Sequence, residues 1–212
     1  MGMMLSMTPP ATPTPPIPPD REQLLTALAT AARERAAALG LSRDDLARRV
    51  HDTPEPTSQQ LSDIARMLDG RRLGLLAKGG LKLLDVLGLQ ELRPVWGPVD
   101  VPPSARAANL SAATDLRLGT DTSIRGRLTY AAARRAVDIG MTREDLARRA
   151  GLADLDREPP PPDHTLRAAA TKFLTGKTSL LTTNGLEVLR ALGLRELQPV
   201  WRTPRKGRSG SA

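Results

Sequence analysis

Residues 40–50 read GLSRDDLARRV, and residues 140–150 read GMTREDLARRA. Both stretches belong to longer matching blocks. Residues 31–50 agree with 131–150 at 11 of 20 positions, and residues 80–96 agree with 185–201 at 11 of 17. Self-similarity of this kind indicates a duplicated unit. Two copies are fewer than the three or more that a solenoid needs, so the sequence predicts two tandem domains.

The rest of the chain is arranged around the two copies. We expect a disordered Pro-rich arm at 1–20 and a first domain, copy 1, at 21–96. A linker at 97–120, a second domain, copy 2, at 121–201 and a basic disordered tail at 202–212 follow. A linker of this length reaches up to ~80 Å when extended. It therefore does not by itself fix how the copies are oriented.

Composition and capping signals predict an all-α fold of two small helical bundles. Leu, Ala and Arg are abundant whereas aromatic residues are few, which favours helices over sheets. Ser42 with Asp45 and Thr142 with Asp145 have the spacing of a capping box, predicting helices at 43–50 and 143–150. Thr57 with Gln60 caps a third helix, and Asp163 is the predicted cap of its counterpart. Fourth helices are expected at about 80–88 and 185–193.

Each copy ends in a repeated motif, ELRPVW in copy 1 and ELQPVW in copy 2. We expect Pro94 and Pro199 to stop the chain after a short helix, because proline cannot continue a helix. Trp96 and Trp201 are expected to fold back over the core of their own copy. The alternative is that the two tryptophans anchor a partner protein.

Several classes of function are not favoured by the residues present. The chain has no cysteine and only two histidines, so we expect no metal site and no cofactor. GKTS at 176–179 looks like the end of a phosphate-binding loop, but Thr171 stands where that loop needs glycine. No nucleophile and base are combined elsewhere, so no enzymatic activity is expected. No apolar run is long enough to cross a membrane.

Residues at similar spacing in each copy resemble the pattern of a known family. The matching positions are Ser42, Leu46, Ala47, Ile64, Gly70, Leu84, Leu87 and Gly88 in copy 1, and Thr142, Leu146, Ala147, Gly151, Gly176, Leu189, Leu192 and Gly193 in copy 2. This pattern resembles the lambda-repressor-like (Cro/cI-type) helix-turn-helix DNA-binding domains. The resemblance implies a bacterial transcription regulator, located in the cytoplasm with the nucleoid, whose partner is double-stranded DNA.

The chain departs from the family pattern in two places. The segment between the second and third helices is long and Pro-rich, HDTPEP at 51–56 and GLADLDREPPPP at 151–162. The glutamate common near the end of the family's recognition helix is Leu68 in copy 1 and Leu174 in copy 2. A longer turn can change the direction of the third helix.

The resemblance implies three groups of DNA-binding residues. The first group is the arginines at the two ends of the second helices, namely Arg43, Arg48, Arg49, Arg143, Arg148 and Arg149. Arg43 and Arg143, at the helix starts, are expected to meet a phosphate. Outward residues of the third helices face base edges: Gln59, Ser62, Arg66, Arg167, Thr171 and Lys172. The tail adds sequence-independent cations, namely Arg205, Lys206 and Arg208.

Net charge leaves two rival interpretations open. The chain carries +8, of which +4 belongs to the tail, while copy 1 carries only +2 and copy 2 only +3. The basic tail fits an architectural protein that binds DNA without sequence preference. The nearly balanced copies fit a protein-interaction module on the same scaffold, with a protein partner or a second chain as its ligand. Arg43 and Arg143, repeated at equivalent positions, favour DNA.

Overall fold

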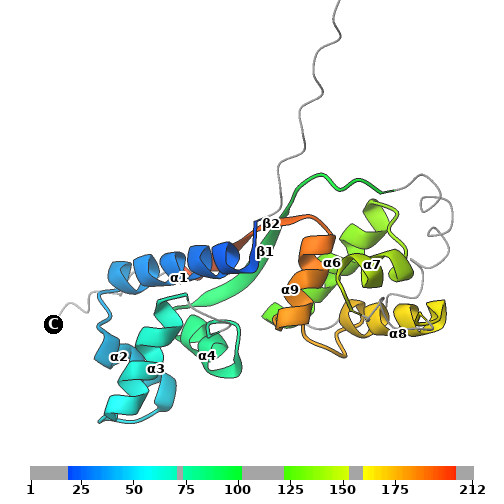
Figure 1. Ribbon diagram of the computed structural model, residues 1–212. Helices are drawn as coiled ribbons and strands as arrows, with labels where there is room; N and C mark the ends of the chain where they lie inside the picture. The colour runs from blue at the N-terminus through cyan, green and yellow to red at the C-terminus, as the bar shows by residue number, and fades with distance from the viewer. Residues whose placement is uncertain (1–18, 71–73, 102–121, 153–159, 204–212) are drawn as a thin grey trace, which may run out of the picture.

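The computed structural model describes residues 19–70, 74–101, 122–152 and 160–203. Within these ranges the chain is mostly helical and contains a small two-stranded sheet (Figure 1). Copy 1 consists of α1 (Arg21–Ala38), α2 (Arg43–His51), α3 (Ser58–Leu68), α4 (Lys78–Val86) and β1 (Leu89–Trp96). Copy 2 consists of α6 (Ile124–Asp138), α7 (Arg143–Arg149), α8 (Asp163–Leu174), α9 (Thr183–Ala191) and β2 (Leu194–Trp201).

Most helices begin where their capping residues predict. Ser42 and Asp45 form a full capping box at the start of α2, and Thr57 and Gln60 form another at α3. Thr142 caps α7 by accepting a hydrogen bond from the Asp145 amide at 3.1 Å. The prediction for α8 is wrong. Its cap is Pro162, and Asp163 is instead the first residue of the helix, where a carboxylate interacts favourably with the helix dipole.

Leucines on one face of each helix form the core of the molecule. In copy 1 the fully buried side chains include Leu28, Leu46, Ile64 and Leu84. Their counterparts in copy 2 include Leu128, Leu146, Leu166 and Leu189. One continuous cluster joins these residues across both copies and also contains leucines of the two strands. The copies therefore share a core.

The repeated C-terminal motifs form strands, so the prediction of a short last helix before each proline is wrong, and the mostly helical fold also contains a small sheet. β1 and β2 pair antiparallel with each other, in the middle of the molecule (Figure 1). Proline is compatible with such a pair because each strand of a two-stranded sheet has one edge without a partner. Val95 and Trp96, and their equivalents in β2, also have high strand propensity.

Pairing of the strands exchanges them between the copies. β1, which ends copy 1, packs against α6 of copy 2, and β2 packs against α1 of copy 1. The sequence predicts that each tryptophan folds over its own copy, whereas in the structure each ring lies beneath an arginine of the other copy. Trp201 lies under the guanidinium of Arg35 at 5.9 Å, and Trp96 lies under that of Arg135 at 6.0 Å. Each contact joins one copy to the other and is favourable as a cation–π interaction.

The strand pair is symmetric: replacing each residue by its equivalent in the other copy gives the same set of facing pairs. Leu89 faces Trp201 and Leu194 faces Trp96, while Leu92 faces Pro199 and Leu197 faces Pro94. Arg93 faces Gln198 at the centre. Beyond the strand ends, the Gly97 amide donates to the Gly193 carbonyl and the Arg202 amide donates to the Gly88 carbonyl, both at 2.7 Å. These symmetric pairs are those of an interface in a two-fold dimer, but here both halves of the interface belong to one chain.

Candidate functional site

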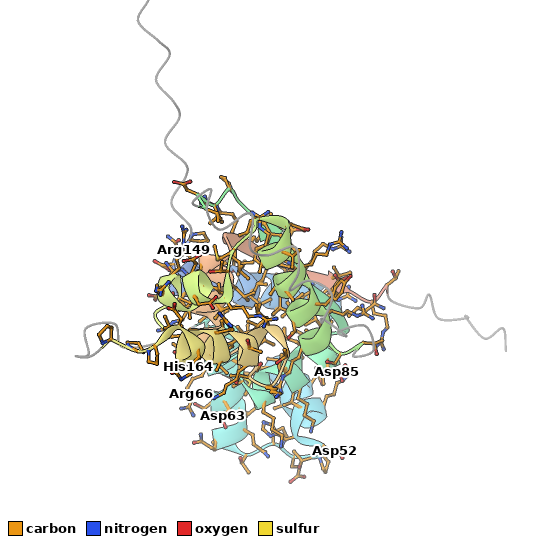
Figure 2. The ribbon with its side chains drawn as sticks, turned by 90° about the vertical axis from the view of Figure 1, so that its right-hand side faces the viewer. Asp52, Asp63, Arg66, Asp85, Arg149 and His164 are labelled. Carbon is orange, nitrogen blue, oxygen red and sulfur yellow. The ribbon has the colours of Figure 1, made fainter. Side chains whose placement is uncertain are left out.

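Two helix pairs, α2–α3 and α7–α8, hold most of the predicted DNA-binding residues. Within each pair the two helices pack directly on each other. Figure 1 shows α3 and α8 on the two sides of the molecule, both below the sheet. Figure 2, turned about the vertical axis, also has both helices in its lower half, with His164 of α8 and Arg66 of α3 labelled. The third helices of both copies therefore lie on the same lower side.

The helix pair of copy 1 is joined by a compact turn. Asp52 ends α2 in the left-handed region with φ 53°, and its amide donates to the Arg48 carbonyl. The Thr53 amide also donates to that carbonyl, at 3.1 Å. These bonds satisfy the end of α2 before Pro54 turns the chain toward α3. The corresponding segment of copy 2 includes 153–159, which lie outside the described residues.

Arg43 and Arg143 occupy the first position of α2 and α7. Arg43 is exposed and Arg143 is half-buried, and neither has an ion-pair partner within the described ranges. At α2 the Ser42 hydroxyl accepts from the Asp45 amide, and the amides of residues 43 and 44 have no acceptor among the residues that the structure describes. Such amides can bind a phosphate oxygen. Asp44, beside them, opposes an anion.

Carboxylates of the capping boxes are strongly hydrogen-bonded. The Ser42 hydroxyl donates to an Asp45 carboxylate oxygen at 2.6 Å, and the Ser42 amide donates to the same oxygen at 3.0 Å. These bonds hold the pKa of Asp45 below its ordinary value. Asp45 therefore stays ionised near neutral pH. It also lies 3.5 Å from Arg48, so one of the predicted phosphate-binding arginines is already close to an anion.

The third helix of copy 1 presents its predicted reading residues to solvent. Gln59, Ser62 and Arg66 are exposed. Two of them converge on Asp63, which accepts from the side-chain amide of Gln59 at 3.0 Å and from the Arg66 guanidinium at 2.7 Å. Figure 2 labels Asp63 and Arg66 side by side on this helix. Asp63 thus orients both side chains and partly neutralises the face.

The third helix of copy 2 is linked to α7 by two ion pairs. Arg167 contacts Glu144 at 2.6 Å, and Arg148 contacts Asp163 at 2.6 Å. Thr171 is half-buried, and its hydroxyl donates to the Arg167 carbonyl. Lys172 is exposed with no ion pair in the described ranges. The structure therefore brings the predicted residues of copy 2 together, but two of the arginines, Arg148 and Arg167, already form ion pairs with carboxylates.

Arg49 and Arg149 lie apart from the reading faces. Both are exposed near the ends of their helices, and the Arg149 guanidinium donates to the Asp100 carbonyl at 2.6 Å. Arg49 has no such partner among the described residues. The tail residues Arg205, Lys206 and Arg208 lie outside the described ranges, as do residues 1–18 of the predicted arm and 102–120 of the predicted linker.

Sequence reasoning missed Arg35 and Arg135 as residues that join the copies. Arg35 donates to the carbonyls of Leu87 and Arg202, at 3.2 and 2.5 Å. Arg135 donates to those of Leu192 and Gly97, at 3.3 and 2.5 Å. Burial lowers the pKa of Arg135, without removing its charge. The signal was present, because both the arginines and the tryptophans recur in the duplication.

The described ranges hold no group of three or more His, Asp or Glu residues that could bind a metal. Within them, no helix combines the length and the apolar character needed to span a membrane. Comparisons of the chain with protein-family models, with curated proteins and with solved structures give no match.

Proposed function

We propose that this chain binds double-stranded DNA through two helix-turn-helix units, α2–α3 and α7–α8, and acts as a transcription regulator. The observation that carries the proposal is the β1–β2 register, which is unchanged when the copies are exchanged. One chain then has the two-fold arrangement with which dimeric helix-turn-helix proteins meet two half-sites.

The position of the third helices supports this function. α3 and α8 lie on one side of the molecule, opposite the sheet (Figure 1). Half-sites for such a pair are spaced by ~34 Å, one turn of the duplex, and are inverted when the protein is two-fold symmetric. Paired strands, rather than the linker alone, restrict the orientation of the copies. The proposed site is therefore an inverted pair of half-sites.

Chemistry at the helix pairs supports contacts to both backbone and bases. Arg43 and Arg143 would pair with phosphates at the helix starts, which positions the units without reading sequence. Gln59 and Arg66 of α3 are suited to adenine and guanine edges. Arg167 and Lys172 are their counterparts on α8. Because these side chains differ, the two half-sites would differ in sequence.

A protein-interaction role for copy 2 is the second candidate. The observation that favours it is the pair of acids, Glu144 and Asp163, that contact Arg167 and Arg148 at 2.6 Å. Bound phosphates would have to compete with these carboxylates. In copy 1, among the described residues, the exposed Arg66 is paired only within its own helix. Copy 1 would then bind DNA while α8 faces a protein.

Selection from random duplex DNA followed by footprinting tests the proposal. The full-length protein is expected to enrich one sequence and to protect two successive major-groove segments on it. Arg66→Ala should lose discrimination in the half-site of copy 1, whereas Arg33→Ala, on the exposed face of α1, serves as the control of equal charge. Enrichment without a preferred sequence would support an architectural role instead. A footprint confined to one major-groove segment would assign α8 to a protein partner.

A further inference from the structure

An open pocket of about 510 Å³ lies between the two copies. Residues 76–78 of copy 1 line it, and so do residues 181–183 of copy 2, which are the same positions of the repeat. A pocket bounded by equivalent positions of two symmetric halves lies on the two-fold axis that relates them. We call it the axial pocket.

The axial pocket is on the side of the molecule that carries the third helices. α4 begins at this pocket and leads to β1, and α9 begins there and leads to β2. The pocket and the sheet therefore lie at opposite ends of two nine-residue helices, about 13 Å apart along each helix. Because α3 and α8 also lie opposite the sheet (Figure 1), the axis passes between them at the pocket.

Three cations surround the axial pocket. Lys78 of α4 and Arg125 of α6 line it, and Lys177 directly precedes Thr178, another lining residue. All three residues are exposed, and within the described ranges none of them has a hydrogen-bond or ion-pair partner. None of the described residues that line the pocket carries a carboxylate. We call Lys78, Arg125 and Lys177 the central basic patch.

The duplication does not predict this patch. Lys78 is replaced by Thr183 in copy 2, and Arg125 corresponds to Leu25, which is buried in copy 1. The cations come from different positions of the two copies, and they surround one pocket only because the shared core holds the copies together. The patch is therefore a property of the whole chain rather than of either copy.

A duplex bound by both third helices would present phosphates to this patch. Two inverted half-sites one helical turn apart place two successive major grooves against α3 and α8. The minor groove then faces the protein midway between them, where the two-fold axis of the protein meets the duplex. This groove is only about 6 Å wide, so a row of phosphates from each strand lies close to the axis. The cations of the patch are complementary in charge to both rows.

We propose that the central basic patch binds the phosphates on both sides of the minor groove at the centre of the DNA site. Lys78 of copy 1 and Arg125 and Lys177 of copy 2 supply the contacts, as charge-assisted bonds to phosphate oxygens. Such contacts carry no sequence information but fix the position of the protein on the duplex. They also favour one spacing of the half-sites, because the shared core joins the patch to both helix pairs. This inference rests on the proposed function and adds a third contact between the two units.

The first test removes charge from the DNA and uses the full-length protein with the duplex selected for the proposed function. Methylphosphonates, which lack the negative charge, replace the phosphates that border the central minor groove on both strands. Affinity should fall by at least about ten-fold, because several charge-assisted bonds are lost. The same number of methylphosphonates placed outside the protected segments is the control and should change affinity by less than about two-fold.

The second test removes charge from the protein. Lys78→Gln and Arg125→Gln should each lower the slope of log K against log salt by about one unit and leave the ranking of half-site sequences unchanged. Arg33→Gln removes the same charge from an exposed position on α1 and should leave the slope unchanged. In the double variant Lys78→Gln/Arg125→Gln, the central methylphosphonates should cost about three-fold at most, since their main partners are already absent. This coupling identifies the contact itself.

Failure of the central contact and failure of the proposed function give different results. If no duplex is enriched and no segment is protected, the proposed function is wrong and this inference falls with it. If the two-segment footprint is present but central methylphosphonates cost the wild-type protein nothing, the central contact is absent while the proposed function stands. The same conclusion follows if they cost the double variant as much as the wild type. Because the methylphosphonate comparison uses the unaltered chain, it gives a result even where a variant folds poorly.

Discussion

At the scale of single residues, Arg43 and Arg143 test the proposed contact with the phosphate backbone. Each stands at the start of a capped helix without an ion-pair partner in the described ranges. Replacing either by alanine should weaken binding to all duplexes similarly and lower the slope of log K against log salt by about one unit. Salt titrations of binding measure this. Slopes that stay at the wild-type value in both variants would remove these helix starts from the interface.

Gly88 and Gly193 form a second matched pair of residues. Both have φ in the left-handed region, 82° and 88°, so alanine costs about 1–2 kcal/mol of folding free energy at either position. At Gly193 the added methyl group also meets Val99, which adds about 1–3 kcal/mol for overpacking. Urea unfolding should therefore rank Gly193→Ala well below Gly88→Ala in stability. Equal losses would mean that Val99 does not cover this glycine in solution.

At the scale of elements, the helices were predictable and the strands were not, for a physical reason. Ser42 with Asp45 and Thr57 with Gln60 act within one turn of the chain, so the local sequence is sufficient to place α2 and α3. β1 is stable only against β2, whose residues are about a hundred positions away. Nothing in ELRPVW or ELQPVW taken alone indicates that each motif pairs with the other. Their prolines exclude a helix interior but do not distinguish a terminus from an edge strand.

In the candidate site too, some features follow from the local sequence, whereas others depend on how the helices pack. Exposure of Gln59 and Arg66 follows from the apolar period of α3, which places Ile64 inside. The ion pairs of Arg148 with Asp163 and Arg167 with Glu144 could not be predicted, since they depend on how α7 and α8 cross. The sequence predicts Asp163 as a helix cap and gives no indication that its carboxylate pairs with Arg148.

The shared core gives a prediction for the strands. Leu92 of β1 is fully buried in a cluster that contains residues of both copies. Leu92→Ala should lower the free energy of unfolding by about 2–5 kcal/mol, and both copies should still unfold in one transition. Arg93→Ala, at the exposed neighbouring position, should change stability by no more than about 0.5 kcal/mol. Fluorescence and circular dichroism during urea unfolding would contradict this if they reported two separate transitions.

At the scale of the whole molecule, the exchanged strands hold the copies together independently of the linker. A protease site inserted after residue 110 allows the chain to be cut between the copies. The two fragments should remain associated during size-exclusion chromatography, because β1 packs on α6 and β2 packs on α1. The cut protein should also keep its two-segment footprint on DNA. Elution as two half-size species would show that the strand pair is too weak to join them.

The centre of the strand pair has a consequence for the origin of the single chain. Arg93 faces Gln198 there, and these are the same position of the repeat. In a homodimer of one-copy ancestors, this position would face itself across the axis, so an arginine would oppose an arginine and destabilise the pair. Within one chain the two halves differ at that point. A strand with arginine then pairs better with the glutamine strand than with a second arginine strand, so the β1–β2 pair is favoured over a β1–β1 pair between two chains.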